Sequence, residues 1–238
     1  MLPSAPRCKI CNSPFSPPLG PVMRLIGKGR WPGNPMYCGG CFKDLYRHRE
    51  GAEVECTLFF ADIRGSTFLA ESMTPNAYRA LLDRFYAVAA DILVSTEGVL
   101  DKFVGDEVVG IFVPAFTGGF HARRAIDAGL DLLRATGNDG DTPWVPIGVG
   151  VNTGTAYVGA VGTADHVEFT ALGDAVNVTA RLASAAGPGE LLVTDAAAEA
   201  AGIPIYGLEH RQLDLRGKSA ATDVVVLTAT QPVALRRG

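Results

Sequence analysis

The stretch FFADIRGST, residues 59–67, decides the fold of this 238-residue chain. The apolar, β-prone residues 54–63 predict a buried strand that reaches Asp62 near its end. The Gly65-Ser66-Thr67 turn predicts the start of a helix, whose unpaired backbone N–H groups suit a polyphosphate. A carboxylate at this point can coordinate a hard cation through oxygen, although Asp62 could also simply cap the turn.

A second aspartate lies in DKFVGDE, residues 101–107. Residues 99–104 and 107–113 predict two strands joined tightly through Gly105-Asp106, and such pairs are common in hairpin turns. Asp106 could therefore serve the turn alone. Placed with Asp62 near one edge of a sheet, it could instead help to hold two divalent ions about 3.5–4 Å apart, as in two-metal phosphoryl chemistry.

A third polar group lies in FTALGDAVNVTAR, residues 169–181. Asn177 and Arg181 are four residues apart on a helix predicted over residues 174–186, so they share one helix face. An amide beside a guanidinium suits a ribose and a phosphate. A helix face that only contacts water is the alternative.

The other segments predict an α+β fold with a mixed sheet. Thr74 and Pro75 predict the N-cap and first residue of a helix that runs to Ser95, and a further helix is predicted over residues 119–135. Further strands are predicted over residues 146–151, 156–161, 167–172, 191–194, 205–208 and 224–227, the first two around a turn at Thr153-Gly154. Because hairpins interrupt the alternation of strands and helices, a doubly wound parallel sheet is disfavoured.

The N-terminal region contains two Cys-x-x-Cys pairs, Cys8/Cys11 and Cys38/Cys41. In a reducing compartment this spacing favours a closed zinc site of four thiolates, with a redox pair or an iron centre as alternatives. A fragment this short needs such a staple to fold. We predict a zinc module over residues 1–46, a linker over 47–52, the main domain over 53–230 and a tail over 231–238. The fifth cysteine, Cys56, is predicted to be a core residue.

The composition excludes some partners. The net charge of −4 gives no reason to expect nucleic acid or an anionic membrane. No apolar run approaches the roughly 18–20 residues that cross a bilayer, and no signal peptide is evident, so we expect a cytoplasmic protein. The basic side chains around the cysteines are expected to contact water, although an unknown acidic regulatory partner of the zinc module is the alternative.

In this order and at these intervals, the segments resemble the catalytic domain of class III adenylyl and guanylyl cyclases. The matching stretches are FFADIRGST, DKFVGDEVVGIF, GVGVNTGTAYVGAVG, FTALGDAVNVTARL and LRGKSAATDVVVL. The resemblance covers roughly residues 53–228. It implies a ferredoxin-like mixed sheet with flanking helices.

The resemblance also implies residue roles. Asp62 and Asp106 would hold two Mg²⁺ or Mn²⁺ ions, and the carbonyl of Ile63 would add a ligand. Asn177 would orient the ribose of the substrate, and Arg181 would stabilise the transition state. The remaining contacts to a nucleoside triphosphate would come from the base-reading residues Lys102 and Thr170 and from Lys218 at the terminal phosphates.

The base-reading pair favours ATP. Lysine offers only donors, which suit adenine N1, and threonine can accept from the adenine 6-amino group. Threonine departs from the aspartate of the commonest adenylyl pattern. It resembles a bacterial-type branch in which stimulation by bicarbonate has been described, and we carry that stimulation as a hypothesis.

In this family the active site lies between two catalytic domains, so the resemblance implies a head-to-tail homodimer with shared sites. The sequence thus predicts an adenylyl cyclase that converts ATP to cyclic AMP and pyrophosphate. A guanylyl cyclase is one alternative. A catalytically silent signalling module that binds nucleotide or a partner is the other.

Overall fold

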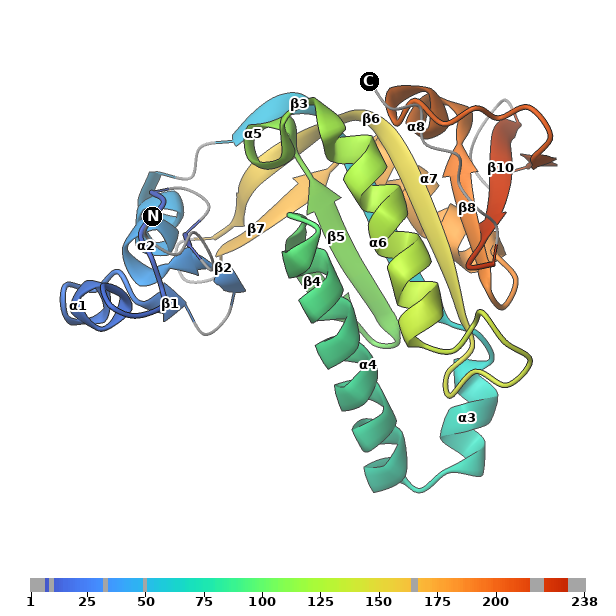
Figure 1. Cartoon of the computed structure of the whole chain (residues 1–238), viewed down its shortest axis with the longest axis horizontal. Helices are drawn as coiled ribbons and strands as arrows, with labels where there is room; N and C mark the ends of the chain where they lie inside the picture. The colour runs from blue at the N-terminus through green and yellow to red at the C-terminus, as the bar shows by residue number, and fades with distance from the viewer. Residues whose placement is uncertain are drawn as a thin grey trace. The chain divides into compact units, whose positions relative to one another are not determined.

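The computed structural model describes residues 7–8, 11–31, 34–48, 51–163, 167–214 and 221–230. The chain forms two compact units. The N-terminal unit comprises Met1–Ala52 together with Tyr157–Thr170, and the main unit comprises Glu53–Ala156 together with Ala171–Gly238 (Figure 1).

The main sheet is mixed, as predicted. Its described strands run in the order β4-β5-β3-β6-β8-β10-β9, and β7 pairs with β6. β6 and β8 are parallel, whereas β3/β5, β4/β5, β8/β10 and β9/β10 are antiparallel. The bounds are β3 Gly51–Ile63, β4 Val99–Val104, β5 Glu107–Phe112, β6 Ile147–Gly162, β7 Val167–Leu172, β8 Glu190–Thr194, β9 Glu209–Leu213 and β10 Thr222–Thr228.

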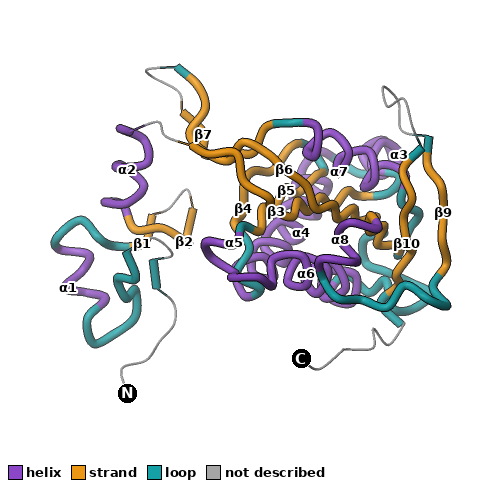
Figure 2. The backbone as a smooth tube through the Cα atoms, turned by 90° about the horizontal axis from the view of Figure 1, so that it is seen from above, coloured by secondary structure: helices purple, strands orange, loops and turns teal. Residues whose placement is uncertain are grey.

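Helices cover both faces of this sheet. The long helices α4 (Pro75–Ser95) and α6 (His121–Ala135) lie on one side of the strands, and α7 (Asp174–Ala185) lies on the other (Figure 2). The predicted start of α4 is confirmed, because the Thr74 side chain accepts a hydrogen bond from Ala77 N and Pro75 is the first helical residue. The shorter helices are α3 Ser66–Ser72, α5 Pro114–Thr117, the 3₁₀ helix η1 Gly118–Phe120 and α8 Asp195–Ala200.

Glycines in β6 allow α7 to lie close to the sheet. A Cβ atom on Gly150 would lie 2.5 Å from the backbone nitrogen of Ala183, and one on Gly148 would lie 2.9 Å from the carbonyl oxygen of Ala186. Real Cβ atoms do not approach backbone so closely. The sequence GVGV therefore sets the position of α7, the helix that carries Asn177 and Arg181.

Two predicted strand assignments were wrong. The turn predicted at Thr153-Gly154 is the middle of one continuous strand, β6. There the Thr153 hydroxyl hydrogen-bonds the Thr57 hydroxyl over 2.7 Å. A Cβ on Gly154 would lie 3.3 Å from Ala175, so this glycine accommodates a neighbouring side chain and makes no turn.

The second wrong assignment is the strand predicted over residues 205–208, which form turns and irregular backbone. The edge strand β9 begins only at Glu209, and its polar, mostly exposed residues carry little apolar signal. The sequence analysis also missed α8, which begins immediately after β8.

The N-terminal unit contains small elements. These are α1 Gly20–Leu25, β1 Arg30–Trp31, β2 Asn34–Cys38 and α2 Gly39–His48, with β1 and β2 antiparallel. Trp31 and Phe42 stack with their ring centroids 5.0 Å apart. Tyr157–Thr170, the end of the β6–β7 hairpin, groups with this unit by its contacts. The predicted domain boundaries stay a prediction.

Among the described helices, none has both the length and the apolar content that a bilayer crossing requires.

Candidate active site

Asp62 lies at the end of β3, opposite Glu107 of β5. Neighbouring side chains on a strand point to opposite faces. Ile63 points into the core under α4 and α6, whereas Phe60 packs with Ala183 of α7. Asp62 therefore lies on the face of the sheet that α7 covers.

Asp106 lies in the two-residue turn between β4 and β5. Gly105 takes a positive φ of 61°, which glycine adopts without strain. The hydroxyl of Tyr86 donates to the Gly105 carbonyl, and the Tyr86 ring stacks on Phe103 at 4.3 Å between centroids. The turn is thus held from α4 as well as by its own strands.

The two aspartates meet at one edge of the sheet. Burial, followed by a hydrogen bond with the Asp106 side chain, raises the pKa of Asp62 to about 7. Burial and then Asp106 and Asp62 also raise the pKa of Tyr78, so this phenol faces the same carboxylates. A cation between the carboxylates would offset their repulsion, and oxygen ligands suit Mg²⁺ and Mn²⁺. The side chains therefore fit the predicted metal site.

Arg64 is the contact of Asp62 that the sequence analysis missed. Its guanidinium forms an ion pair with Asp62 and lowers the pKa of that carboxyl, against the effects of burial and Asp106. It also donates to the carbonyl of Ser184 over 2.8 Å, near the end of α7. Its backbone N–H donates to Pro146 O over 2.8 Å. The sequence signal for this ion pair was the position of Arg64 two residues after Asp62.

The start of α3 follows Asp62 directly, as predicted. Gly65 is its N-cap, with a φ of 68° and no side-chain cap. Ser66 and Thr67 open the helix, so the Gly65-Ser66-Thr67 backbone lies within a few residues of the metal-site carboxylate. The role of this turn in phosphate binding stays a prediction.

Lys102 lies on β4 opposite Val109, which in turn lies opposite Phe60 of β3. Cross-strand partners point to the same face, so Lys102 shares the α7 face with Asp62. Two strand spacings of about 4.8 Å separate β4 from β3. Thr170 lies on β7 and is 5% exposed.

Asn177 and Arg181 share one face of α7, as their spacing predicted, and this face points outward. Asn177 is exposed and Arg181 is half-buried, whereas the opposite face is buried through Ala175, Val178, Thr179, Leu182 and Ala183. In the described part of the chain, no hydrogen bond or ion pair joins Asn177 or Arg181 to either aspartate. Lys218 lies outside the described residues.

The four paired cysteines converge. Their sulfur atoms all lie within 4.8 Å of one another, and Cys11 Sγ lies 3.6 Å from Cys38 Sγ. A tetrahedron with Zn–S bonds of ~2.3 Å has S–S edges of about 3.8 Å. The backbone N–H groups of Cys38 and Cys41 point at Cys8 Sγ and Cys38 Sγ, over 3.2 and 3.4 Å. The donor set therefore fits a closed tetrahedral metal site.

A cavity of about 410 Å³ lies elsewhere in the main unit, where its lining includes Asn152, Thr155, Asp174 and Asp195. Pro146, whose carbonyl accepts from the Arg64 N–H, lies next to the site, just before the start of β6. Asn152 of the cavity is six residues further along the chain, which is roughly 20 Å at ~3.3 Å per residue, so the cavity is distant from Arg64. None of the predicted site residues lines this cavity.

Comparison with known proteins places this geometry in context. The family described as adenylate and guanylate cyclase catalytic domain matches residues 50–227. The terminal-differentiation specific adenylate cyclase of Dictyostelium discoideum is 33% identical over 177 residues, which cover 71% of this chain and 8% of that protein. The chain spans 8–26% of the length of the first three curated relatives that it matches.

Two solved structures are similar over most of their length. The adenylyl cyclase CyaB from P. aeruginosa is 28% identical with a TM-score of 0.66, covering 75% of this chain and 96% of that one. The guanylyl cyclase Cya2 is 26% identical with a TM-score of 0.68, covering 78% of this chain and 98% of that one.

Proposed function

Because the chain belongs to the family of adenylate and guanylate cyclase catalytic domains, we propose that it converts ATP to 3′,5′-cyclic AMP and pyrophosphate. The observation that carries the proposal is the meeting of Asp62 and Asp106 at one sheet edge, where Asp62 lies opposite Glu107 and the backbone N–H of Ile63 donates to the carbonyl of Asp106 over 3.4 Å. In the reaction, the ribose 3′-oxygen bonds to the α-phosphorus, the bond from that phosphorus to the β-phosphate breaks, and the hydroxyl proton leaves.

Asp62, Asp106 and the carbonyl of Ile63 would hold two Mg²⁺ or Mn²⁺ ions. When bound, such ions lower the pKa of a coordinated hydroxyl and offset charge on the phosphates. The Gly65-Ser66-Thr67 backbone directs N–H groups to the triphosphate. Arg64, which pairs with Asp62 and the end of α7, limits where that carboxylate can point.

The outward face of α7 supplies the remaining polar contacts. The Asn177 amide hydrogen-bonds the ribose and fixes the direction of the 3′-oxygen. The Arg181 guanidinium donates to the phosphate oxygens, on which charge grows as the leaving bond breaks. The role of Lys218 at the terminal phosphates rests on its sequence context alone.

The choice of ATP over GTP rests on Lys102 and Thr170. Lysine donates to adenine N1, and the threonine hydroxyl accepts from the 6-amino group. Guanine presents the opposite pattern at these atoms, namely an N1–H donor and a 6-oxo acceptor. The similarity to the guanylyl cyclase Cya2 keeps GTP as the second candidate substrate.

The placement of the polar groups supports the proposal of a homodimer with shared sites. Asn177 and Arg181 face outward, and within the described residues they make no hydrogen bond or ion pair to Asp62 or Asp106. A two-fold arrangement lets the aspartates of one copy serve the α7 residues of the other, and it generates two equivalent sites.

The test is turnover of ATP and of GTP, with Mg²⁺ or Mn²⁺, across a range of protein concentrations. We expect cyclic AMP as the main product and a specific activity that rises with concentration, because each site needs two copies. A faster rate with GTP would overturn the choice of base. Nucleotide binding by a dimeric sample without turnover of either nucleotide would overturn the enzymatic function.

The cysteine cluster of Cys8, Cys11, Cys38 and Cys41 would hold one structural Zn²⁺. Four thiolates leave no open position for catalysis. Metal analysis of the purified chain is expected to find one zinc per chain, and to find less in a Cys11→Ser variant. Bound iron, or a disulfide in place of metal, would contradict the zinc assignment.

A further inference from the structure

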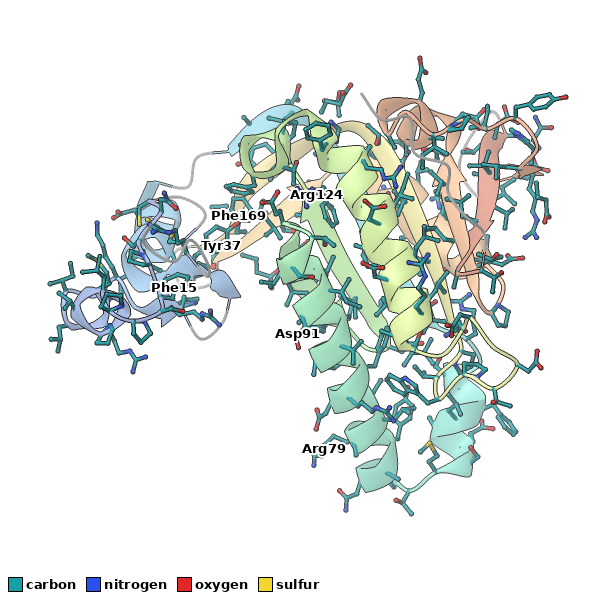
Figure 3. The ribbon with its side chains drawn as sticks, viewed as in Figure 1. Phe15, Tyr37, Arg79, Asp91, Arg124 and Phe169 are labelled. Carbon is teal, nitrogen blue, oxygen red and sulfur yellow. The ribbon has the colours of Figure 1, made fainter. Side chains whose placement is uncertain are left out.

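The ring of Tyr37 packs edge-on against the ring of Phe169. Figure 3 labels both residues on the N-terminal unit. Their ring centroids lie 6.2 Å apart with an interplanar angle of 65°, and Tyr37 is fully buried. Both residues belong to the N-terminal unit, although more than a hundred residues separate them in the chain. An edge-to-face pair of this kind adds a favourable interaction beyond the burial of its surface.

At one end, this pair is joined through the chain to the cysteine cluster. Tyr37 directly precedes Cys38, which is itself fully buried and whose backbone N–H donates to Cys8 Sγ over 3.2 Å. A metal bound to the four sulfurs would fix the backbone at Cys38, and hence the position of the adjacent ring. Without a metal, so small a unit has little apolar core to hold that ring in place.

At the other end, Phe169 is itself part of β7, the strand that carries Thr170. Phe169 directly precedes Thr170 in β7, and successive side chains of a strand point to opposite faces. A second contact holds the same hairpin, since a Cβ on Gly51 would lie 2.4 Å from the ring of Tyr157 on β6. The N-terminal unit thus supports β7 from the face opposite to Thr170.

We propose that Tyr37 and Phe169 are positioning residues that couple metal binding in the cysteine cluster to nucleotide recognition by Thr170. With metal bound, the module holds β7 where Thr170 can meet the base. Without metal, β7 loses this support and the base binds more weakly. The proposal rests on the proposed role of Thr170 in a cyclase, and it predicts a change in nucleotide affinity and little change in the chemical step.

The experiment uses the full chain with Tyr37→Leu, Phe169→Leu, the double variant and the conservative Tyr37→Phe. Affinity is measured directly with an ATP analogue that lacks the 3′-hydroxyl and cannot cyclise, alongside KM, kcat, zinc content and a thermal melt. Both leucine variants are expected to bind the analogue about tenfold more weakly, the order of one aromatic contact, with kcat nearly unchanged. The double variant is expected to be no weaker than either single variant, and Tyr37→Phe is expected to bind like the parent chain.

Zinc removal from the unmodified chain is the second arm, and it does not depend on any variant folding. A chelator that prefers Zn²⁺ to Mg²⁺ is expected to weaken analogue binding by a similar factor, and added Zn²⁺ is expected to restore it. The Tyr37→Leu variant is expected to respond little to the chelator. Phe120→Leu is the matched control, because this side chain is 68% exposed and lies in the main unit.

Two results would overturn the coupling. One is an affinity for the ATP analogue that does not change when zinc is removed. The other is a loss of affinity in the double variant that equals the product of the losses in the two single variants. Either could occur in an active cyclase, so the proposed activity would survive. Conversely, the chain could bind the ATP analogue more weakly after zinc removal and yet make no cyclic nucleotide. That result would support the coupling and contradict the proposed activity.

Discussion

The backbone N–H of Ile63 donates a hydrogen bond to the backbone carbonyl of Asp106 over 3.4 Å. This bond joins the end of β3 to the turn between β4 and β5. It brings Asp62 and Asp106 together although 44 residues separate them in the chain. The carboxylate pair therefore depends on strand pairing, and either side chain can be changed without loss of the backbone contact.

Replacing Asp106 with asparagine tests the role of this pair in metal binding. The variant keeps the size of the side chain and removes its charge, so we expect cyclase activity to fall about 100-fold, the equivalent of about 3 kcal/mol of charge stabilisation. Thermal stability should be unchanged or higher, because two neighbouring like charges become one. Asp91→Asn, at an exposed position on α4, is the control and should keep full activity. Substantial activity in Asp106→Asn would contradict a role for the Asp106 charge in catalysis.

Mixing two inactive variants tests whether the sites are shared. Asp62→Asn removes the metal side of each site, and Arg181→Ala removes the side contributed by α7. In an equal mixture, random pairing makes half of the dimers mixed, and each mixed dimer has one intact site of two. We therefore expect about a quarter of the parent specific activity after exchange of subunits. Asp62→Asn mixed with Asp106→Asn should stay inactive. Equal inactivity of both mixtures would indicate that each chain builds its own site.

The placement of α7 is tested at Gly150. An alanine Cβ there would lie 2.5 Å from Ala183 N and 2.8 Å from Thr179 O, and neither backbone atom can move without the whole helix. We expect Gly150→Ala to lower the free energy of unfolding by about 1–3 kcal/mol and to reduce activity, since α7 carries Asn177 and Arg181. Gly119→Ala is the matched control, because a Cβ there has no neighbour within 4 Å. Equal stability of the two variants in urea would show that α7 does not lie against β6 in this way.

Local patterns predicted which secondary-structure elements carry the candidate site residues, whose roles stay a prediction. Asp62 lies near the end of a strand with a clear apolar run, and Asp106 lies in the tight turn after another strand. Asn177 and Arg181 have helical spacing. The local placement of all four could therefore be predicted from neighbouring residues. The convergence of the four cysteines could also be predicted, because two Cys-x-x-Cys pairs have the spacing that is typical of metal sites.

Contacts between distant segments could not be predicted in this way. The pairing of Arg64 with both Asp62 and the end of α7 depends on where α7 lies, which β6 glycines set from across the sheet. Gly154 looked like a turn residue because its role, making room for Ala175, appears only when α7 is in place. The contact of Tyr37 with Phe169 joins segments that no local periodicity relates.

The ion pair between Arg211 and Glu190 makes stability depend on pH in a direction that can be worked out. The guanidinium donates to both Glu190 oxygens, over 2.8 and 2.7 Å, and joins the edge strand β9 to the start of β8. The Arg211 hydrogen bond lowers the pKa of Glu190 below its ordinary value, with a further contribution from Gly187 N–H. A carboxyl with a lowered folded-state pKa adds stability above its unfolded pKa, roughly 4.3, and loses it as pH falls through the folded value.

Arg211→Gln should therefore lower the free energy of unfolding by about 0.5–1 kcal/mol at pH 7, and the difference from the parent chain should shrink as the pH falls below about 4. Urea unfolding at pH 7, 4 and 3 measures this. Arg79→Gln is the control, because the Arg79–Asp83 pair is 72% and 57% exposed and should contribute little at any of these pH values. A difference for Arg211→Gln that stays constant down to pH 3 would show that the arginine stabilises the strand edge by packing, and that the charge of Glu190 contributes nothing measurable.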